Sequence, residues 1–227
     1  MVARADVELL RQGFAAASTL AKRDLERYFA AINLDRPEMA RDGLLEFMPA
    51  LTDTYGSATA VVAADWYDEQ RNLAGVSGSF RSEIAPTVPV EQVVQRVRFG
   101  AAHLFTEAPG LMLPFLLGIT DKYVKEPGRQ TLWQSAARDP ARPRWARVPS
   151  GLETCDWCVM LASRGFVYHS EASARRSEIS KFHEDCDCAL VMEWSKHPRL
   201  EGYDPQDYYA QYVDRLTRPS SQNSPAA

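Results

Sequence analysis

The sequence predicts a mainly α protein, in which a long N-terminal helical bundle is followed by a small α+β unit stapled by zinc. Three observations predict this fold class. Apolar residues recur at helical steps through the first half, prolines and arginines crowd residues 138–149, and all four cysteines follow, at Cys155, Cys158, Cys186 and Cys188. With 227 residues, 45% of them hydrophobic, the chain is long enough to bury a core.

Two long helices are expected at the start of the chain. Apolar and small residues at steps of three and four form one stripe from Val7 to Ile32. Asp35 is a suitable helix cap and Pro37 suits a first turn, so a second helix should begin there and reach Gln70. A short turn between two such helices predicts an antiparallel hairpin.

Further helical patterns follow a loop between Leu73 and Val88 that is rich in glycine, serine and proline. Helical spacing resumes from Val90 to Phe105 and is broken at Pro109-Gly110. A buried helix is then expected over 111–123, and a weaker one over 129–137. We interpret all of these stripes as core packing.

The stretch 138–149 carries three prolines and four arginines and marks a domain boundary, because dense proline prevents helix and favours an extended connector. The predicted organisation is a helical domain at 1–137, a connector at 138–149, a Cys/His domain at 150–197, a C-terminal helix at 198–217 and a disordered tail at 218–227. Within this second half the expected elements are strands at 145–148, 166–168 and 188–194, helices at 158–163 and 170–180, and a last helix opening at Asp204-Pro205.

Charge and hydropathy exclude several classes of protein. A net charge of −4 and a pI near 5.6 argue against a general nucleic-acid binder. The chain does not open on a signal-peptide pattern, and its longest apolar run, 111–119, is shorter than the roughly 20 residues that span a bilayer. We therefore expect a soluble protein made in a reducing compartment.

The cysteines and one histidine form a metal-ligand pattern: Cys155-x-x-Cys158, then His183-x-x-Cys186-x-Cys188. Zinc takes four soft or borderline donors in a tetrahedron, and the CxxC pair makes half of such a site. The second cluster offers three donors for two places. Cys186 and Cys188 point to the same side if the residue between them is in a strand, and His183 is either a ligand or a hydrogen-bond partner of a thiolate.

Other readings of the cysteines remain open at this point. They are four reduced thiols without metal, two disulfides, or a redox CxxC. Disulfides would need an oxidising compartment, and a redox CxxC would need a thioredoxin-like context that the flanking pattern lacks. Structural zinc is favoured because a unit of about fifty residues has too little core to stand alone.

At these residues the sequence resembles the phage Mu head-morphogenesis family, the MuF-like minor capsid proteins of tailed phages, in the version seen in actinobacterial phages. The resemblance rests on Arg144-Trp145, the CxxC at 155–158 and the closing cluster at 183–188, and it covers about a quarter of the chain. Glu184 and Asp187 depart from the commoner family ending, which has proline and arginine at those places.

The resemblance implies a structural, non-enzymatic minor head protein. It implies a position in the phage head interior or at the portal vertex, with the host cytoplasm as the place of assembly. The implied partners are the portal protein and capsid or scaffold proteins, and the implied work is head morphogenesis, DNA packaging or DNA delivery.

Two enzymatic functions are the alternatives to this structural role. A treble-clef-type nuclease would use His169 or His183 with carboxylates at Asp156, Glu184 or Asp185, but the chain lacks a histidine–histidine or histidine–asparagine pair that could activate water against a phosphate. A capsid-maturation protease would need a nucleophile with a base in reach, and the candidates are Ser163, Ser170 and Ser173 near His169.

The arginines of the connector are candidates for non-specific contact with packaged DNA. Phosphate contacts release counterions, so even a small basic patch binds in a salt-dependent way. The competing interpretation is an exposed linker with solvated charges. The residues concerned are Arg138, Arg142, Arg144 and Arg147.

Overall fold

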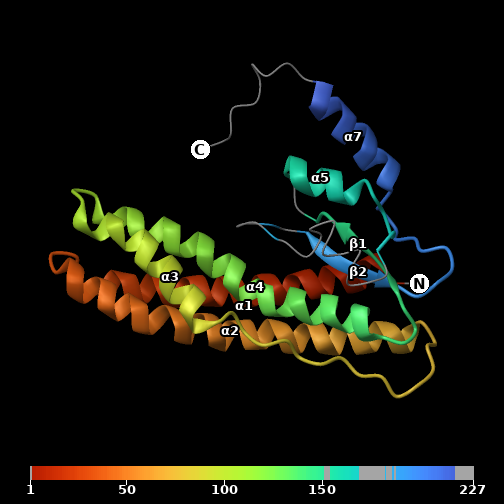
Figure 1. Cartoon of the computed structure of the whole chain (residues 1–227), viewed down its shortest axis with the longest axis horizontal. Helices are drawn as coiled ribbons and strands as arrows, with labels where there is room; N and C mark the ends of the chain where they lie inside the picture. The colour runs from red at the N-terminus through yellow and green to blue at the C-terminus, as the bar shows by residue number, and fades with distance from the viewer. Residues whose placement is uncertain (1, 151–153, 169–181, 183–185, 187, 218–227) are drawn as a thin grey trace.

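Three long helices form a bundle in the computed structural model of this chain, and a two-stranded sheet with two shorter helices packs on one end of it (Figure 1). The structure describes residues 2–150, 154–168, 182, 186 and 188–217. The predicted mainly α fold class is confirmed by this architecture.

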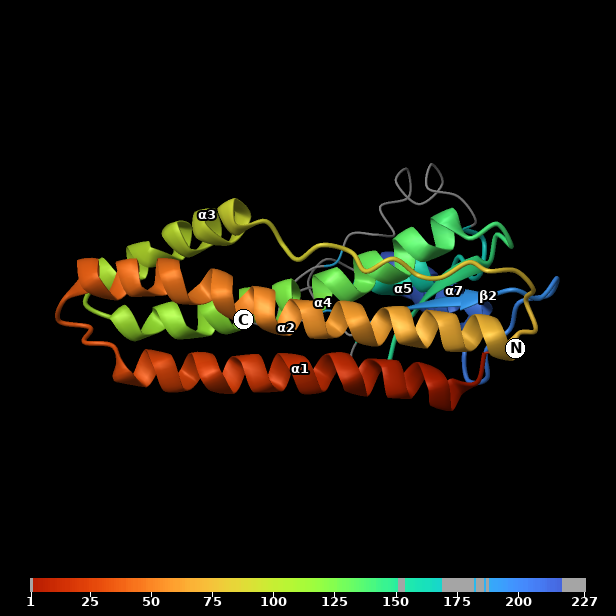
Figure 2. The same cartoon turned by 90° about the horizontal axis from the view of Figure 1, so that it is seen from below.

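The bundle is made of α1 (Arg4–Ala31), α2 (Pro37–Leu73) and α4 (Met112–Arg138), and each of them contacts the other two. Figure 2 shows α1 and α2 side by side along their lengths, which confirms the predicted hairpin. Both helices begin and end within a few residues of the positions that the apolar stripe predicted, since a stripe of this length is a strong local signal.

A shorter helix, α3 (Val90–Gly100), packs on α2 and α4. The sequence predicted that it would continue to Phe105, but the chain tightens into a 3₁₀ turn over Ala101–Phe105. A second 3₁₀ turn, Pro109–Leu111, leads directly into α4. An apolar stripe does not distinguish an α-helix from a 3₁₀ turn over one or two turns.

The two separate helices expected over 111–123 and 129–137 are one continuous helix, α4, which is a correction. Pro127 lies inside it and removes one backbone hydrogen bond, a loss that usually ends or kinks a helix. Packing overrides this cost. The Thr59 hydroxyl of α2 donates to the carbonyl of Val124 at 2.6 Å, and the Thr131 hydroxyl donates to that of Pro127 at 2.9 Å.

The sheet pairs β1 (Arg144–Val148) with β2 (Ala189–Glu193) in antiparallel register, with Trp145 opposite Met192. The strand expected at 166–168 is reduced to one bridge, in which the Trp145 N–H donates to the Tyr168 carbonyl at 2.9 Å. The predicted strands at 145–148 and 188–194 are confirmed to within a residue.

Two helices complete the C-terminal part: α5 (Asp156–Ala162) and α7 (Pro205–Thr217). The bundle helices α1 and α4 contact β2, whereas α5 contacts β1 and α7 packs on α5. The helix predicted over 170–180 and the tail predicted at 218–227 lie outside the described residues.

One buried hydrophobic cluster contains side chains from both sides of the predicted connector. Leu10 of α1 and Leu132 of α4 share it with Trp145 of β1 and Leu190 of β2. A second cluster fills the other half of the bundle between α1, α2, α3 and α4. The C-terminal part is therefore packed into the core of the molecule.

Asp139, at the end of α4, links three parts of the chain. Its buried carboxylate accepts hydrogen bonds from the Tyr67 hydroxyl at 3.0 Å, Arg71 Nε at 3.0 Å, Trp194 Nε1 at 3.1 Å and the N–H of Ala141 at 2.8 Å. Burial alone would raise the pKa of this carboxyl, but the four donors hold it below its ordinary value.

Candidate metal centre

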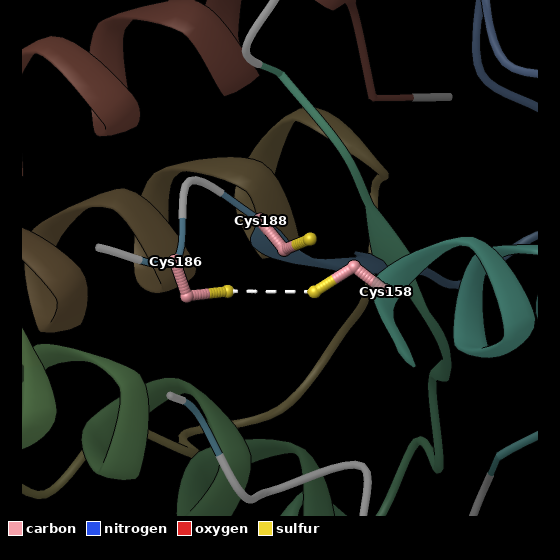
Figure 3. A group of neighbouring side chains, drawn as sticks. All are labelled: Cys158, Cys186 and Cys188. Carbon is pink, nitrogen blue, oxygen red and sulfur yellow. Dashed lines mark hydrogen bonds between the residues drawn. The ribbon is translucent and has the colours of Figure 1, made fainter. Parts of the chain in front are cut away.

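Three of the four cysteines converge in the interior, where α5 meets the residues before β2. Cys158 lies in α5, and Cys186 and Cys188 come directly before β2, so the helix and the strand together position the sulfurs. Figure 3 shows the three side chains turned toward a common point. Their exposed fractions are 1%, 1% and 3%, respectively.

The geometry of the three sulfurs fits a tetrahedral metal ion. All three Sγ atoms lie within 4.8 Å of one another, and the Cys158 and Cys186 sulfurs are 3.6 Å apart. A Zn–S bond of about 2.3 Å places two sulfurs of a tetrahedral centre about 3.8 Å apart. None of the four cysteines is in a disulfide. Cys158, Cys186 and Cys188 can therefore hold three corners of a zinc site.

The predicted first ligand, Cys155, has a different position. It precedes α5 as its N-cap, where its sulfur accepts a hydrogen bond from the Cys158 N–H at 3.4 Å, and it is exposed. It is not in the group of three sulfurs that lie within 4.8 Å. His183, the other candidate for the fourth corner, lies outside the described residues.

The thiols are electrostatically coupled. The sulfurs of Cys158 and Cys186 share a hydrogen bond, and this bond, with help from Cys188 and the guanidinium of Arg147, holds the pKa of Cys186 far below its ordinary value. The same bond, together with burial, raises the pKa of Cys158. Thiolate is the form that binds zinc, and the guanidinium of Arg147 beside Cys186 favours that form at this sulfur.

Two buried arginines lie beside the thiols. Arg147 of β1 donates to Cys186 Sγ at 3.2 Å, and Arg129 of α4 donates to the Cys186 carbonyl at 2.5 Å. Their guanidiniums are 3.8 and 4.0 Å from the ring centre of Phe182. Burial lowers the pKa of Arg129, whereas at Arg147 the neighbouring thiolates outweigh burial and raise the pKa.

Sequence reasoning did not find this part of the site. Arg129 lies in a helical stripe remote from the cysteines, and Phe182 is a single aromatic residue, so neither carries a local signal. Arg147 was interpreted as part of an exposed connector. The predicted strand at 145–148 includes Arg147, but its burial was not expected, because both faces of β1 are buried in the structure.

The candidate DNA-contacting arginines are not one patch. Arg147 is fully buried and so is turned away from solvent, whereas Arg138, Arg142 and Arg144 are exposed. Arg138 is paired with Glu83. Contact of the three exposed arginines with DNA remains a proposal.

The residues considered for enzymatic chemistry are only partly described. Asp156 forms an ion pair with Arg215 at 2.7 Å, and the Ser163 hydroxyl donates to the Met160 carbonyl at 2.8 Å. The remaining candidates lie outside the described residues: His169, Ser170, Ser173, Glu184 and Asp185.

The fold and the site define a mainly helical protein whose C-terminal part is packed on a helical bundle around a cluster of buried thiols. The chain belongs to the family described as VG15 protein, which it matches over residues 1–215. Among the described residues, no helix is both long and apolar enough to cross a membrane.

Two curated relatives come from bacteriophages, and both bear the name Gene 15 protein. The protein of Mycobacterium phage D29 is 27% identical over 63% of this chain and 62% of its own length. That of Mycobacterium phage L5 is 26% identical over 63% of this chain and 61% of its own length. The chain thus spans less than two thirds of the length of these relatives. No solved structure matches it.

Proposed function

We propose that this chain is a structural minor head protein of a tailed phage or prophage, in which one zinc ion cross-links α5 to the residues before β2 within the C-terminal part. It docks to the portal or the inner capsid surface and assists head morphogenesis, DNA packaging or DNA delivery. The metal ligands are Cys158, Cys186 and Cys188, with Cys155 or His183 at the fourth corner.

The observation that carries this proposal is the closed character of the thiol cluster. A catalytic zinc site keeps one coordination position open to substrate, whereas a structural site is enclosed by protein. Here the three sulfurs are buried, and the cavity that reaches Cys186 and Cys188 measures about 70 Å³. Pockets that take a substrate-sized ligand usually measure about 300–1,000 Å³, so this cavity is too small to admit one to the sulfurs.

The proposed place in the virion is supported by the bacteriophage family and by the resemblance of the Cys/His region to MuF-like proteins. A structural ion suits that place, because it contributes folding free energy to a region that is otherwise small. Zinc supplies no chemistry in this proposal beyond fixing the thiolate side chains.

Metal analysis of the purified chain tests the zinc centre. Protein prepared without chelator should contain about one zinc per chain, and Cys158→Ser or Cys188→Ser should remove it. Leu9→Ser, at an exposed position of α1, is the matched control and should retain the metal. A zinc content near zero in the unchanged chain would contradict the proposed zinc site.

The docking proposal is tested by co-expression with the portal protein of the same phage or prophage, followed by affinity purification at low salt. The two proteins should be recovered together, and the chain should be found in purified virions. If the two proteins are reproducibly not recovered together and the chain is absent from purified virions, the assignment to the phage head is overturned. A nuclease or protease would instead leave nicked DNA or a cleaved capsid protein.

A further inference from the structure

The buried thiols have a charge that the surrounding protein must balance. Three thiolates and one Zn²⁺ carry a formal net charge of −1, and a buried charge is costly unless a counter-charge or hydrogen bond is close. Arg147, which is fully buried, donates to the sulfur of Cys186 at 3.2 Å. Hydrogen bonds between a charged donor and a charged acceptor are about twice as strong as neutral ones.

A second guanidinium completes this environment. Arg129 is 4% exposed and donates to the carbonyl of Cys186, so the sulfur and the backbone of one cysteine are each held by an arginine. The ring of Phe182 contacts both guanidiniums and stabilises them through cation–π interaction, and all three side chains are buried. The three side chains come from α4, from β1 and from the residue four positions before Cys186.

We propose that Arg147 is a positioning residue of the metal centre: it orients Cys186 as a ligand and, with Arg129, neutralises the negative charge of the metal–thiolate group. This inference rests on the proposed zinc site. It also accounts for the placement of an arginine in the buried strand β1, where an apolar side chain would otherwise pack best.

The inference predicts a specific defect for Arg147→Met, which keeps the length of the side chain and removes its charge. Zinc affinity, measured by competition with a chelating indicator, should fall about 10- to 100-fold, the usual effect of losing an outer-shell partner of a metal ligand. With Co²⁺ as the probe, the sulfur-to-cobalt charge-transfer band should weaken, because Cys186 is no longer held at the ion. The rise in melting temperature on adding zinc should shrink.

Arg71→Met is the matched control. Arg71 is also buried, but its Nε is bound to the carboxylate of Asp139 at 3.0 Å, away from the thiols. Its loss should lower the melting temperature equally with zinc and with chelator, and should leave the zinc affinity unchanged. If Arg147→Met behaved in the same way as this control, the arginine would be merely structural and the inference would be overturned.

Two further results distinguish a failure of the zinc site from a failure of the inference about Arg147. If the unchanged chain binds no zinc, the metal centre fails and the inference fails with it, whereas normal binding by Arg147→Met overturns the inference alone. If Arg147→Met does not fold, Arg147→Lys takes its place, since it keeps the charge without the planar donor group. A lysine variant with unchanged affinity and an unchanged cobalt band would contradict positioning by the guanidinium.

Discussion

At the scale of the residue, buried charge in this protein lies against specific partners. Arg71 and Asp139 form a pair in which the carboxylate is shared with three other donors, and Arg147 lies against a thiol. Such groups are strongly coupled to their surroundings, because removal of one member leaves the other buried without compensation. Single substitutions at these positions should therefore have large and selective effects.

Asp139→Asn should lower the free energy of unfolding at pH 7 by about 3 kcal/mol, since it breaks a buried ion pair. The pKa of Asp139 lies below its ordinary value in the folded state, so its contribution is fully present above about pH 4 and is lost as the pH falls further. The difference in stability between the two proteins should consequently narrow in acid. Urea unfolding at pH 7 and pH 3 measures both effects.

Asp42→Asn is the control for this prediction. Asp42 pairs with Arg41 at 2.7 Å, but its side chain is 62% exposed, and surface pairs contribute between about 0 and 1 kcal/mol. An Asp139→Asn protein as stable as Asp42→Asn at pH 7 would contradict the role given to the buried carboxylate.

Which residue is the fourth ligand of the proposed metal centre is also a question about single side chains. Cys155 already caps α5 through its sulfur, and it is exposed. We expect Cys155→Ser to weaken zinc binding less than Cys158→Ser, because a hydroxyl can keep the cap whereas no oxygen replaces a buried thiolate. Competition with a chelating indicator measures both affinities. Equal losses in the two variants would make Cys155 a full ligand and exclude His183 from that corner.

At the scale of the element, the long helices are positioned by close backbone contact. A Cβ atom added to Gly128 of α4 would lie 2.4 Å from Cζ of Phe14 and 2.8 Å from the carbonyl oxygen of Thr59. These atoms belong to α1 and α2, so the three helices meet at this glycine. The same stretch contains Pro127, and the contact explains why the helix continues through a residue that usually ends one.

Gly128→Ala should therefore destabilise the protein by about 1–3 kcal/mol, the usual cost of overpacking, even though alanine favours a helix more than glycine does. Gly110→Ala is the matched control, because nothing lies within 4 Å of the added atom, and it should be nearly neutral. Thermal unfolding by circular dichroism distinguishes them. Equal melting temperatures would show that the helices can separate slightly at no cost.

At the scale of the whole molecule, the C-terminal part depends on the bundle. The N–H of Val2 donates to the carboxylate of Glu193 in β2 at 2.7 Å, so the start of the described chain is bound to the second strand of the sheet. Trp145 and Leu190 pack with residues of α1 and α4 in one cluster. The proposed zinc ion would therefore stabilise one end of a shared core.

A fragment of residues 138–227 should consequently fail to fold cooperatively when zinc is added, since its apolar side chains lose their partners on the helices. Far-ultraviolet circular dichroism and tryptophan emission during a zinc titration measure this, with the full chain as the control. A fragment that folded with one zinc per chain would instead establish the boundary predicted at 138–149 as that of an independent domain.

Much of the fold follows from local signals. The stripe that starts at Val7 and the proline at position 37 placed the first two helices closely, because helix periodicity and capping act over short distances. The continuity of α4 through Pro127 and the burial of Arg147 were not predicted. Both depend on partners that are distant in the sequence, and no short segment records them.

The candidate site, like the fold, was predicted from the sequence only in part. Spacing by itself identified five candidate donors for one ion, since sulfur chemistry and turn geometry are properties of the residues and their neighbours. They are Cys155, Cys158, His183, Cys186 and Cys188. The tertiary structure decided which sulfurs meet, and it added Arg129 and Arg147 as their neighbours. Charge compensation acts across space, so only the packing of α4, β1 and α5 around the thiols determined it.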